Sequence, residues 1–216
     1  MTDFSMSISV VDKIHACLDL DGPKNFFFFA SAGSAEIDSL VRSLKGFRKE
    51  DINHLRLSGR KVAIITYTKA ARDEIERRLE FDSAFKVSTI HSFVWDLIKP
   101  YQADIREWVK GHLQSEVNEL SALQRAEKSG SKAASDRQIQ ITFMLARLEA
   151  LEYIREFAYD PYGDNTSWHS LNHAEVIDMA SEFLHTRKLL QEILVGAFPI
   201  LLIDESVNAI LNRQNQ

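Results

Sequence analysis

Two acidic residues, Asp204 and Glu205, stand side by side directly after the apolar run that begins at Pro199. The run has the length and composition of a buried β-strand, so the acidic pair falls at the carboxyl end of that strand. Two neighbouring carboxylates attract a hard cation such as Mg²⁺. The pair is therefore a candidate cation site, and the alternative is that it only ends a strand.

Hydroxyl, phenol and imidazole side chains gather where two further predicted strands end. They are Thr66, Tyr67 and Thr68 after one strand, and Thr89, His91 and Ser92 after the other. Open parallel sheets bind their ligands at the carboxyl ends of strands, which makes both groups candidate binding residues. Each group also has a structural interpretation. Thr68 has the chemistry of an N-cap for a helix beginning at Lys69, and the alternative role of His91 is a structural hydrogen bond.

A third candidate is a pair of histidines, His169 and His173. Their spacing of four residues is that of two metal ligands on one helix face. The two histidines straddle a predicted helix start, and the sequence offers no obvious third ligand. We interpret the spacing as coincidental.

The elements that position these residues alternate along the chain. Strands are predicted at Asn25–Ala30, Lys61–Thr66, Phe85–Thr89 and Pro199–Asp204, and helices in a stretch ending near Gly46 and at about 69–79, 93–98, 104–127, 134–157 and 173–194. The runs Asn25–Ala30 and Lys61–Thr66 are almost wholly apolar, as in strands covered by helices on both faces. The alternation predicts an α/β fold with an open parallel sheet.

The character of the chain changes near Tyr101, where strand-like runs give way to long helical periodicity. We therefore expect a discontinuous α/β domain formed by residues 1–100 and 173–206. An all-helical insertion covers residues 101–172, and residues 207–216 form a polar tail. Cys17 is the only cysteine, which excludes an internal disulfide and suits a reducing compartment.

The net charge and the lengths of the apolar runs bear on whether the chain binds nucleic acid or a membrane. The net charge is −5, which argues against a surface that is basic throughout, although a local basic groove remains open. The longest apolar runs, Phe26–Ala30 and Phe198–Ile203, are far shorter than a membrane span. The first ten residues lack the basic and apolar regions of a secretory signal. We expect a cytoplasmic protein with no membrane contact.

Four segments, taken in order, resemble the motifs of UvrD/Rep-type superfamily 1 DNA helicases. They are Ala30-Ser-Ala-Gly-Ser34, similar to the start of the phosphate loop AxAGSGKT; Thr66-Tyr-Thr-Lys-Ala-Ala71, similar to TFTNKAA; Ser88-Thr-Ile-His-Ser-Phe93, similar to GTFHSF; and Leu201-Leu-Ile-Asp-Glu205, similar to the LxVDE strand of motif II. The predicted helical insertion falls where this family carries its 1B subdomain. The resemblance covers essentially the whole chain.

The resemblance implies a P-loop, RecA-like first motor domain that binds ATP and Mg²⁺ in the family. It assigns the phosphate loop to Ala30, Ser31, Ala32, Gly33, Ser34, Ala35, Glu36 and Ile37. By the same resemblance, Asp204 would hold Mg²⁺ and Glu205 would be the catalytic residue that activates water. The segments Thr66–Thr68 and Thr89–Ser92 match loops that contact the backbone of single-stranded DNA in the family.

The phosphate loop departs from the family pattern in its most important positions. Ala35, Glu36 and Ile37 stand where a working loop has glycine, lysine and a hydroxyl residue. Glu36 places an anion where the triphosphate needs a cation. At about 4 Å and an effective dielectric near 20, such a pair is worth about 4 kcal/mol, so the reversed sign opposes nucleotide binding strongly.

A second departure follows motif II, where Val207 and Asn208 stand in place of Gln and Asp. The sequence also holds no second motor domain. We therefore expect a truncated helicase homologue that is not an ATPase on its own, needs no cofactor, and keeps weak affinity for single-stranded DNA or a scaffold role. The alternatives are one half of a split helicase completed by a partner chain, and a regulator of a helicase or nuclease in defence against foreign DNA.

Overall fold

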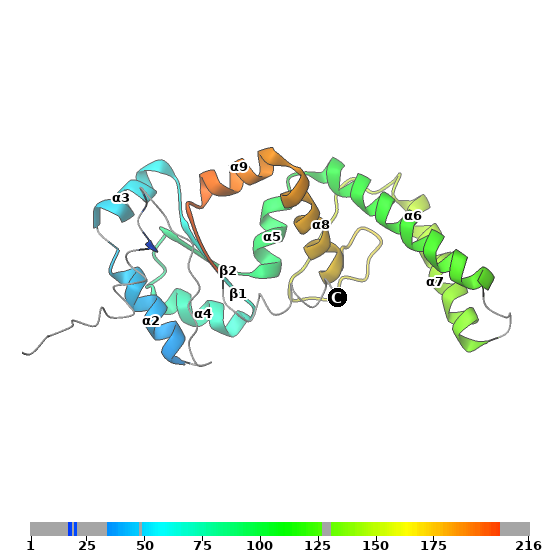
Figure 1. Cartoon of the computed structure of the whole chain (residues 1–216), viewed down its shortest axis with the longest axis horizontal. Helices are drawn as coiled ribbons and strands as arrows, with labels where there is room; N and C mark the ends of the chain where they lie inside the picture. The colour runs from blue at the N-terminus through cyan, green and yellow to red at the C-terminus, as the bar shows by residue number, and fades with distance from the viewer. Residues whose placement is uncertain (1–16, 19, 21–33, 48, 127–130, 204–216) are drawn as a thin grey trace, which may run out of the picture. The chain divides into compact units, whose positions relative to one another are not determined.

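The computed structural model describes residues 17–18, 20, 34–47, 49–126 and 131–203 of the chain (Figure 1). Within these residues the fold is α/β, with a small parallel sheet and many helices. The strands are β1 (Val62–Thr66), β2 (Phe85–Thr89) and β3 (Ile200–Ile203). The helices are α2 (Ser34–Lys45), α3 (Lys49–Ser58), α4 (Lys69–Arg78), α5 (Ile90–Ile98), α6 (Gln102–Ala126), α7 (Lys132–Ala150), α8 (His173–Thr186) and α9 (Lys188–Ala197).

The sheet has the strand order β2-β1-β3, and both pairings are parallel. All five residues of the central strand β1 are buried, as its continuously apolar sequence predicts. The predicted α/β fold class with a parallel sheet is thereby confirmed. The predicted strand Asn25–Ala30 lies outside the described residues.

The core of the sheet forms where α4 packs against β1 and β2 and where α2 meets α4 (Figure 1). Its buried side chains are Leu18, Val41, Leu44, Leu55, Val62, Ile64, Ile75, Leu79, Val87 and Ile200. Aliphatic residues from strands and helices thus share one core, and their burial is the main favourable contribution to folding of this part.

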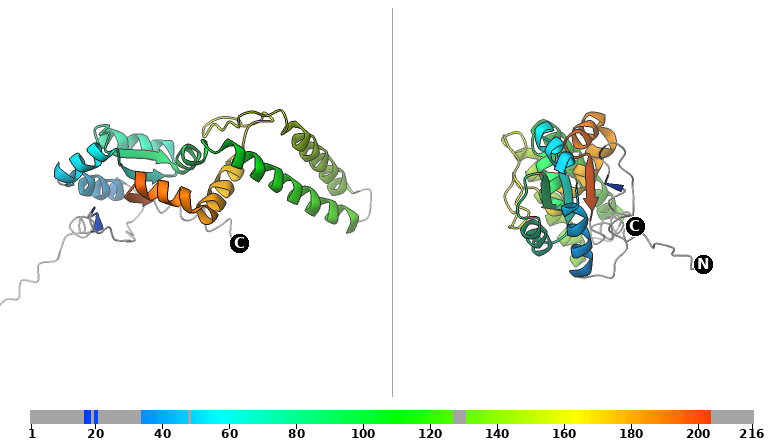
Figure 2. Two further views of the ribbon diagram at one scale, coloured as in Figure 1. Left: turned by 90° about the horizontal axis from the view of Figure 1, so that it is seen from above. Right: turned by 90° about the vertical axis from the view of Figure 1, so that its left-hand side faces the viewer.

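Contacts divide the chain into two units, one of residues 1–93 and 187–216 and the other of residues 94–186. The boundary falls inside α5, near the predicted start of the insertion. In the second unit α6 and α7 form a long helical hairpin (Figure 2). Residues 104–126 and 131–157, the described part of the predicted helical region, contribute no strand to the sheet. The domain boundaries proposed from the sequence stay a prediction.

In the helical unit, polar contacts join the beginning of α6 to the segment that follows α7. The guanidinium of Arg106 on α6 donates to the backbone carbonyls of Leu151 and Ile154 and lies 5.8 Å from the ring centroid of Phe157. The amide of Phe157 donates to Oε1 of Gln102 at 2.7 Å.

None of the described helices is long and apolar enough to cross a membrane.

Several helices differ from the sequence prediction. Helix α7 ends at Ala150 and not at Phe157. Arg106 donates to the carbonyl of Leu151, which a longer helix would use for the amide of Arg155. The single helix predicted from His173 to Leu194 is two helices, α8 and α9, separated at Arg187, whose backbone is extended (φ −112°, ψ 97°). Helix α3 was not predicted, and its few apolar positions explain why.

Candidate nucleic-acid interface

The two polar groups predicted at strand ends lie at the same edge of the sheet. Strands β1 and β2 are parallel neighbours, and their last residues, Thr66 and Thr89, are register partners. The segments that follow, Tyr67–Thr68 and Ile90–Ser92, therefore leave the sheet side by side. Parallel pairing thus brings together two segments that are 23 positions apart in the sequence.

Each strand is followed directly by a helix that a threonine caps. The Oγ1 atom of Thr68 accepts a hydrogen bond from the amide of Ala71 at 3.1 Å, which is the N-cap of α4. Similarly, Oγ1 of Thr89 accepts from the amide of Ser92 at 3.4 Å at the start of α5. An N-cap satisfies an amide that the first helical turn leaves without a partner. The predicted capping role of Thr68 is confirmed.

Burial separates the six candidate residues into two kinds. Thr66 and Thr89 are only 1% and 3% exposed, and their hydroxyls donate to the carbonyl of Thr68 at 3.1 Å and to Oγ of Ser92 at 3.0 Å. Tyr67 is 43% exposed and Thr68 is also exposed, whereas His91 and Ser92 are half-buried. The buried threonines shape the loops, and the other four residues are accessible to a ligand.

The rings of Tyr67 and His91 lie across the two loops from each other. Their centroids are 6.4 Å apart, and the ring planes are tilted by 54°. A phenol and an imidazole can each stack on a nucleic-acid base and donate a hydrogen bond to a phosphate oxygen. This edge of the sheet therefore carries an exposed aromatic face beside hydroxyl groups.

The beginnings of α4 and α5 add a favourable field for an anion. Neither helix has an acidic residue in its first turn, and both helices are described in full. Backbone amides and the helix dipole make such helix beginnings attractive to phosphate groups. Lys69, the first residue of α4, is exposed and adds a cation. The helix beginnings and Lys69 at this edge of the sheet therefore favour binding of the phosphate groups of a nucleic acid.

The residues assigned to nucleotide chemistry mostly lie outside the described part of the chain. These are Ala30–Gly33 of the phosphate loop, the metal candidate Asp204 and the catalytic candidate Glu205. Ser34, Ala35, Glu36 and Ile37 fall in the first turns of α2. The assignments at these positions stay predictions.

The histidine pair of the sequence does not form a metal site among the described residues, where no cluster of three metal-binding side chains occurs. The Nδ1 atom of His173 lies 2.5 Å from the hydroxyl of Tyr159. Burial, and then the negative charge of Asp160, raise the pKa of Tyr159 well above its usual value. The phenol therefore stays protonated at neutral pH, and it gives Nδ1 of His173 a hydrogen-bond partner.

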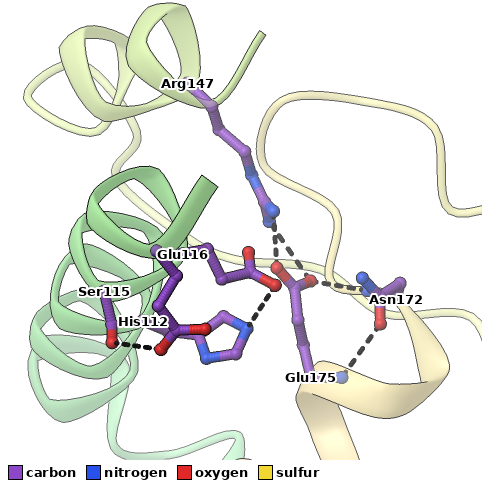
Figure 3. A network of polar contacts seen from close by, with 7 residues as sticks. His112, Ser115, Glu116, Arg147, Asn172 and Glu175 are labelled. Carbon is purple, nitrogen blue, oxygen red and sulfur yellow. Dashed lines mark hydrogen bonds and ion pairs between the residues drawn. The ribbon is translucent and has the colours of Figure 1, made fainter. Parts of the chain in front are cut away.

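The sequence analysis missed a buried ion pair between Arg147 of α7 and Glu175 of α8 (Figure 3). The closest nitrogen and oxygen are 2.5 Å apart, and the two side chains are 10% and 5% exposed. Glu175 also accepts from the amide of Asn172 at 2.8 Å, while Oδ1 of Asn172 accepts from the amide of Glu175 at 2.9 Å. This reciprocal arrangement is a capping box, and its spacing of three residues is the signal that the sequence offered.

Comparisons with known proteins relate half of the chain to one larger protein. Over 109 residues the chain is 33% identical to the Gabija protein GajB of Bacillus cereus (strain HuB5-5). These residues are 50% of this chain and 16% of GajB, so the match spans about a sixth of the relative's length. No protein-family model matches the chain, and no solved structure matches it.

Proposed function

We propose that the chain is a helicase-related protein that corresponds to the amino-terminal part of a UvrD/Rep-type superfamily 1 helicase. Its role is to bind single-stranded DNA weakly at the carboxyl ends of β1 and β2. The observation that carries the proposal is the pairing of Thr66 with Thr89. Because of this pairing, the two segments that resemble the family's DNA-contacting loops begin at one edge of the sheet. The parallel sheet and the similarity to GajB support the same assignment.

The proposed DNA site works through the backbone of the nucleic acid. Amides at the starts of α4 and α5, the Thr68 hydroxyl and Lys69 would contact phosphates, which carry no sequence information. The ring of Tyr67 would stack on a base, because every base has an aromatic face. Binding should therefore tolerate any base sequence. The chain's net charge of −5 keeps the electrostatic contribution small.

We expect dissociation constants for single-stranded DNA of about 10⁻⁴ to 10⁻⁶ M, weakening as salt is raised. Changing Tyr67→Ala should weaken binding roughly tenfold, because base stacking on an aromatic ring is worth about 1–3 kcal/mol. Changing His91→Ala should also weaken it. The measurement is fluorescence anisotropy of a labelled oligothymidine at two salt concentrations.

Two control variants test whether DNA binds at this edge of the sheet. Thr68→Ser keeps a hydroxyl for the N-cap and should bind as the unchanged protein does, whereas Thr68→Ala loses about 1 kcal/mol of stability with the cap. Tyr153 is 84% exposed and lies in the other unit, so Tyr153→Ala should leave DNA binding unchanged. If neither Tyr67→Ala nor His91→Ala weakens DNA binding, DNA binds at a site other than this edge of the sheet.

The second candidate function is one half of a split ATP-dependent helicase that a partner chain completes. The observation in its favour is that GajB is much longer than the stretch it shares with this chain. This function needs ATP binding, which Ala35, Glu36 and Ile37 oppose. We expect no binding when the chain is titrated with ATP and Mg²⁺, and no ATP turnover. Turnover that is lost in Glu205→Gln would favour the split motor.

A third candidate is a regulator of a helicase or nuclease in defence against foreign DNA. The similarity to a Gabija protein fits a helicase-related or a defence role. Such a regulator would bind its partner through an exposed surface and would not need the strand-end site. Unchanged partner binding by the Tyr67→Ala variant would then distinguish this function from the first.

A further inference from the structure

A stacked pair of exposed aromatic side chains lies on the helical unit. Phe143 of α7 and Trp168 of the loop before α8 have ring centroids 5.1 Å apart and planes within 19°. Phe143 is 56% exposed and Trp168 is 45% exposed. One turn before Phe143, Ile139 is 65% exposed. We call these three residues the Phe143 patch.

The patch belongs to a helix that is apolar on two sides. Ile141 and Ala134 of α7 are buried, and α7 packs on α6. Ile139 and Phe143 are four residues apart and so share a different, solvent-facing side of the helix. A surface helix normally carries polar residues on its outer side, and a helix with apolar residues on both sides is normally covered on both.

The aromatic pair is held in place by the buried polar network. Arg147, one turn after Phe143, binds Glu175 (Figure 3). It also donates to the backbone carbonyl of Ser170 at 2.9 Å. Ser170 stands two residues after Trp168, and the carbonyl of the intervening His169 accepts from the amide of Ala158 at 3.0 Å. The loop is thereby fixed against α7. A patch that is ordered before binding loses little entropy when it binds.

Charge decides what kind of molecule fits the patch. Residues 94–186 contain fifteen Asp and Glu but only nine Lys and Arg, with histidines counted as neutral. The net charge of this unit is therefore more negative than the −5 of the whole chain. Asp136, three residues before Ile139 on α7, and Asp164, four residues before Trp168, are exposed. A nucleic acid would be repelled by such a unit, and so would a second copy of the same face.

We propose that the Phe143 patch docks a basic amphipathic helix of a partner protein. The apolar side of that helix would cover Phe143, Trp168 and Ile139, and its lysines and arginines would face the exposed carboxylates of this acidic unit. Amphipathic helices commonly bind in this way, with apolar anchors at helical spacing. The surface is separate from the strand-end site, so this inference does not depend on the proposed function.

The test uses the full chain and a labelled synthetic helical peptide of leucine and lysine. Fluorescence anisotropy should show binding, and Phe143→Ser should weaken it by about tenfold or more, as expected for an aromatic anchor at the centre of an interface. Ile139→Ser is a second, independent variant, and Phe143→Tyr should retain binding. Leu57 is 90% exposed in the other unit, so Leu57→Ser is the matched control and should bind normally.

Three outcomes would overturn the proposal. The first is peptide binding that is equal in Phe143→Ser, Ile139→Ser and the unchanged chain, which would reflect general attraction to an acidic protein. The second is an oligothymidine that binds in a Phe143-dependent way, which would make the patch a base-stacking surface. The third is self-association that Phe143→Ser abolishes, measured by sedimentation in the absence of peptide.

Discussion

Replacing Arg147 with methionine is expected to lower the free energy of unfolding by about 3–5 kcal/mol. The change removes the cation but leaves the carboxylate of Glu175 buried, at 5% exposure. A buried charge without its partner costs far more than the pair contributes, because the desolvation of the remaining ion is no longer compensated. Urea unfolding followed by circular dichroism measures the effect.

Two further variants test the cause of this loss. Arg155 is exposed, so Arg155→Met should change the stability by no more than about 0.5 kcal/mol. Adding Glu175→Gln to Arg147→Met removes the orphaned charge and keeps an acceptor for the amide of Asn172. The double variant should therefore recover part of the stability. A cost below about 1 kcal/mol for Arg147→Met would mean that the pair is solvated and not buried.

The sheet could be predicted from the sequence because its strands are short runs that alternate with helical stretches, and β1 and β3 are largely apolar. The predicted strand Phe85–Thr89 has the bounds of β2, and Lys61–Thr66 differs from β1 by one residue. The break at Arg187 could not be predicted. Val176, Phe183 and Leu190 are all buried and follow one helical period across the break, so periodicity alone indicates a single helix.

The candidate site was partly visible in the sequence for a similar reason. Its residues follow strands directly, so a parallel sheet brings Thr66 and Thr89 to one edge. The sequence could not tell that these two threonines are buried while Tyr67 is exposed. It also could not pair Arg147 with Glu175, because the partner lies 28 residues away and charged side chains on a long helix are normally solvated.

A large effect is also expected in the sheet unit from the change Ile64→Ala. Ile64 is 2% exposed in the middle of the central strand β1 and belongs to the core cluster that includes Leu44 and Leu55. Truncation removes apolar contacts and leaves a cavity that β1, paired on both sides, cannot close. We expect the free energy of unfolding to fall by about 2–5 kcal/mol.

The matched control for this change is Leu57→Ala, which shortens a side chain that is 90% exposed and should cost under about 0.5 kcal/mol. Ile64 and Arg147 belong to different units and share no partner. If the chain unfolds in one step, the costs of Ile64→Ala and Arg147→Met should add to within about 0.5 kcal/mol. Two separate unfolding transitions, each shifted by only one of the changes, would show instead that the sheet unit and the helical unit unfold independently.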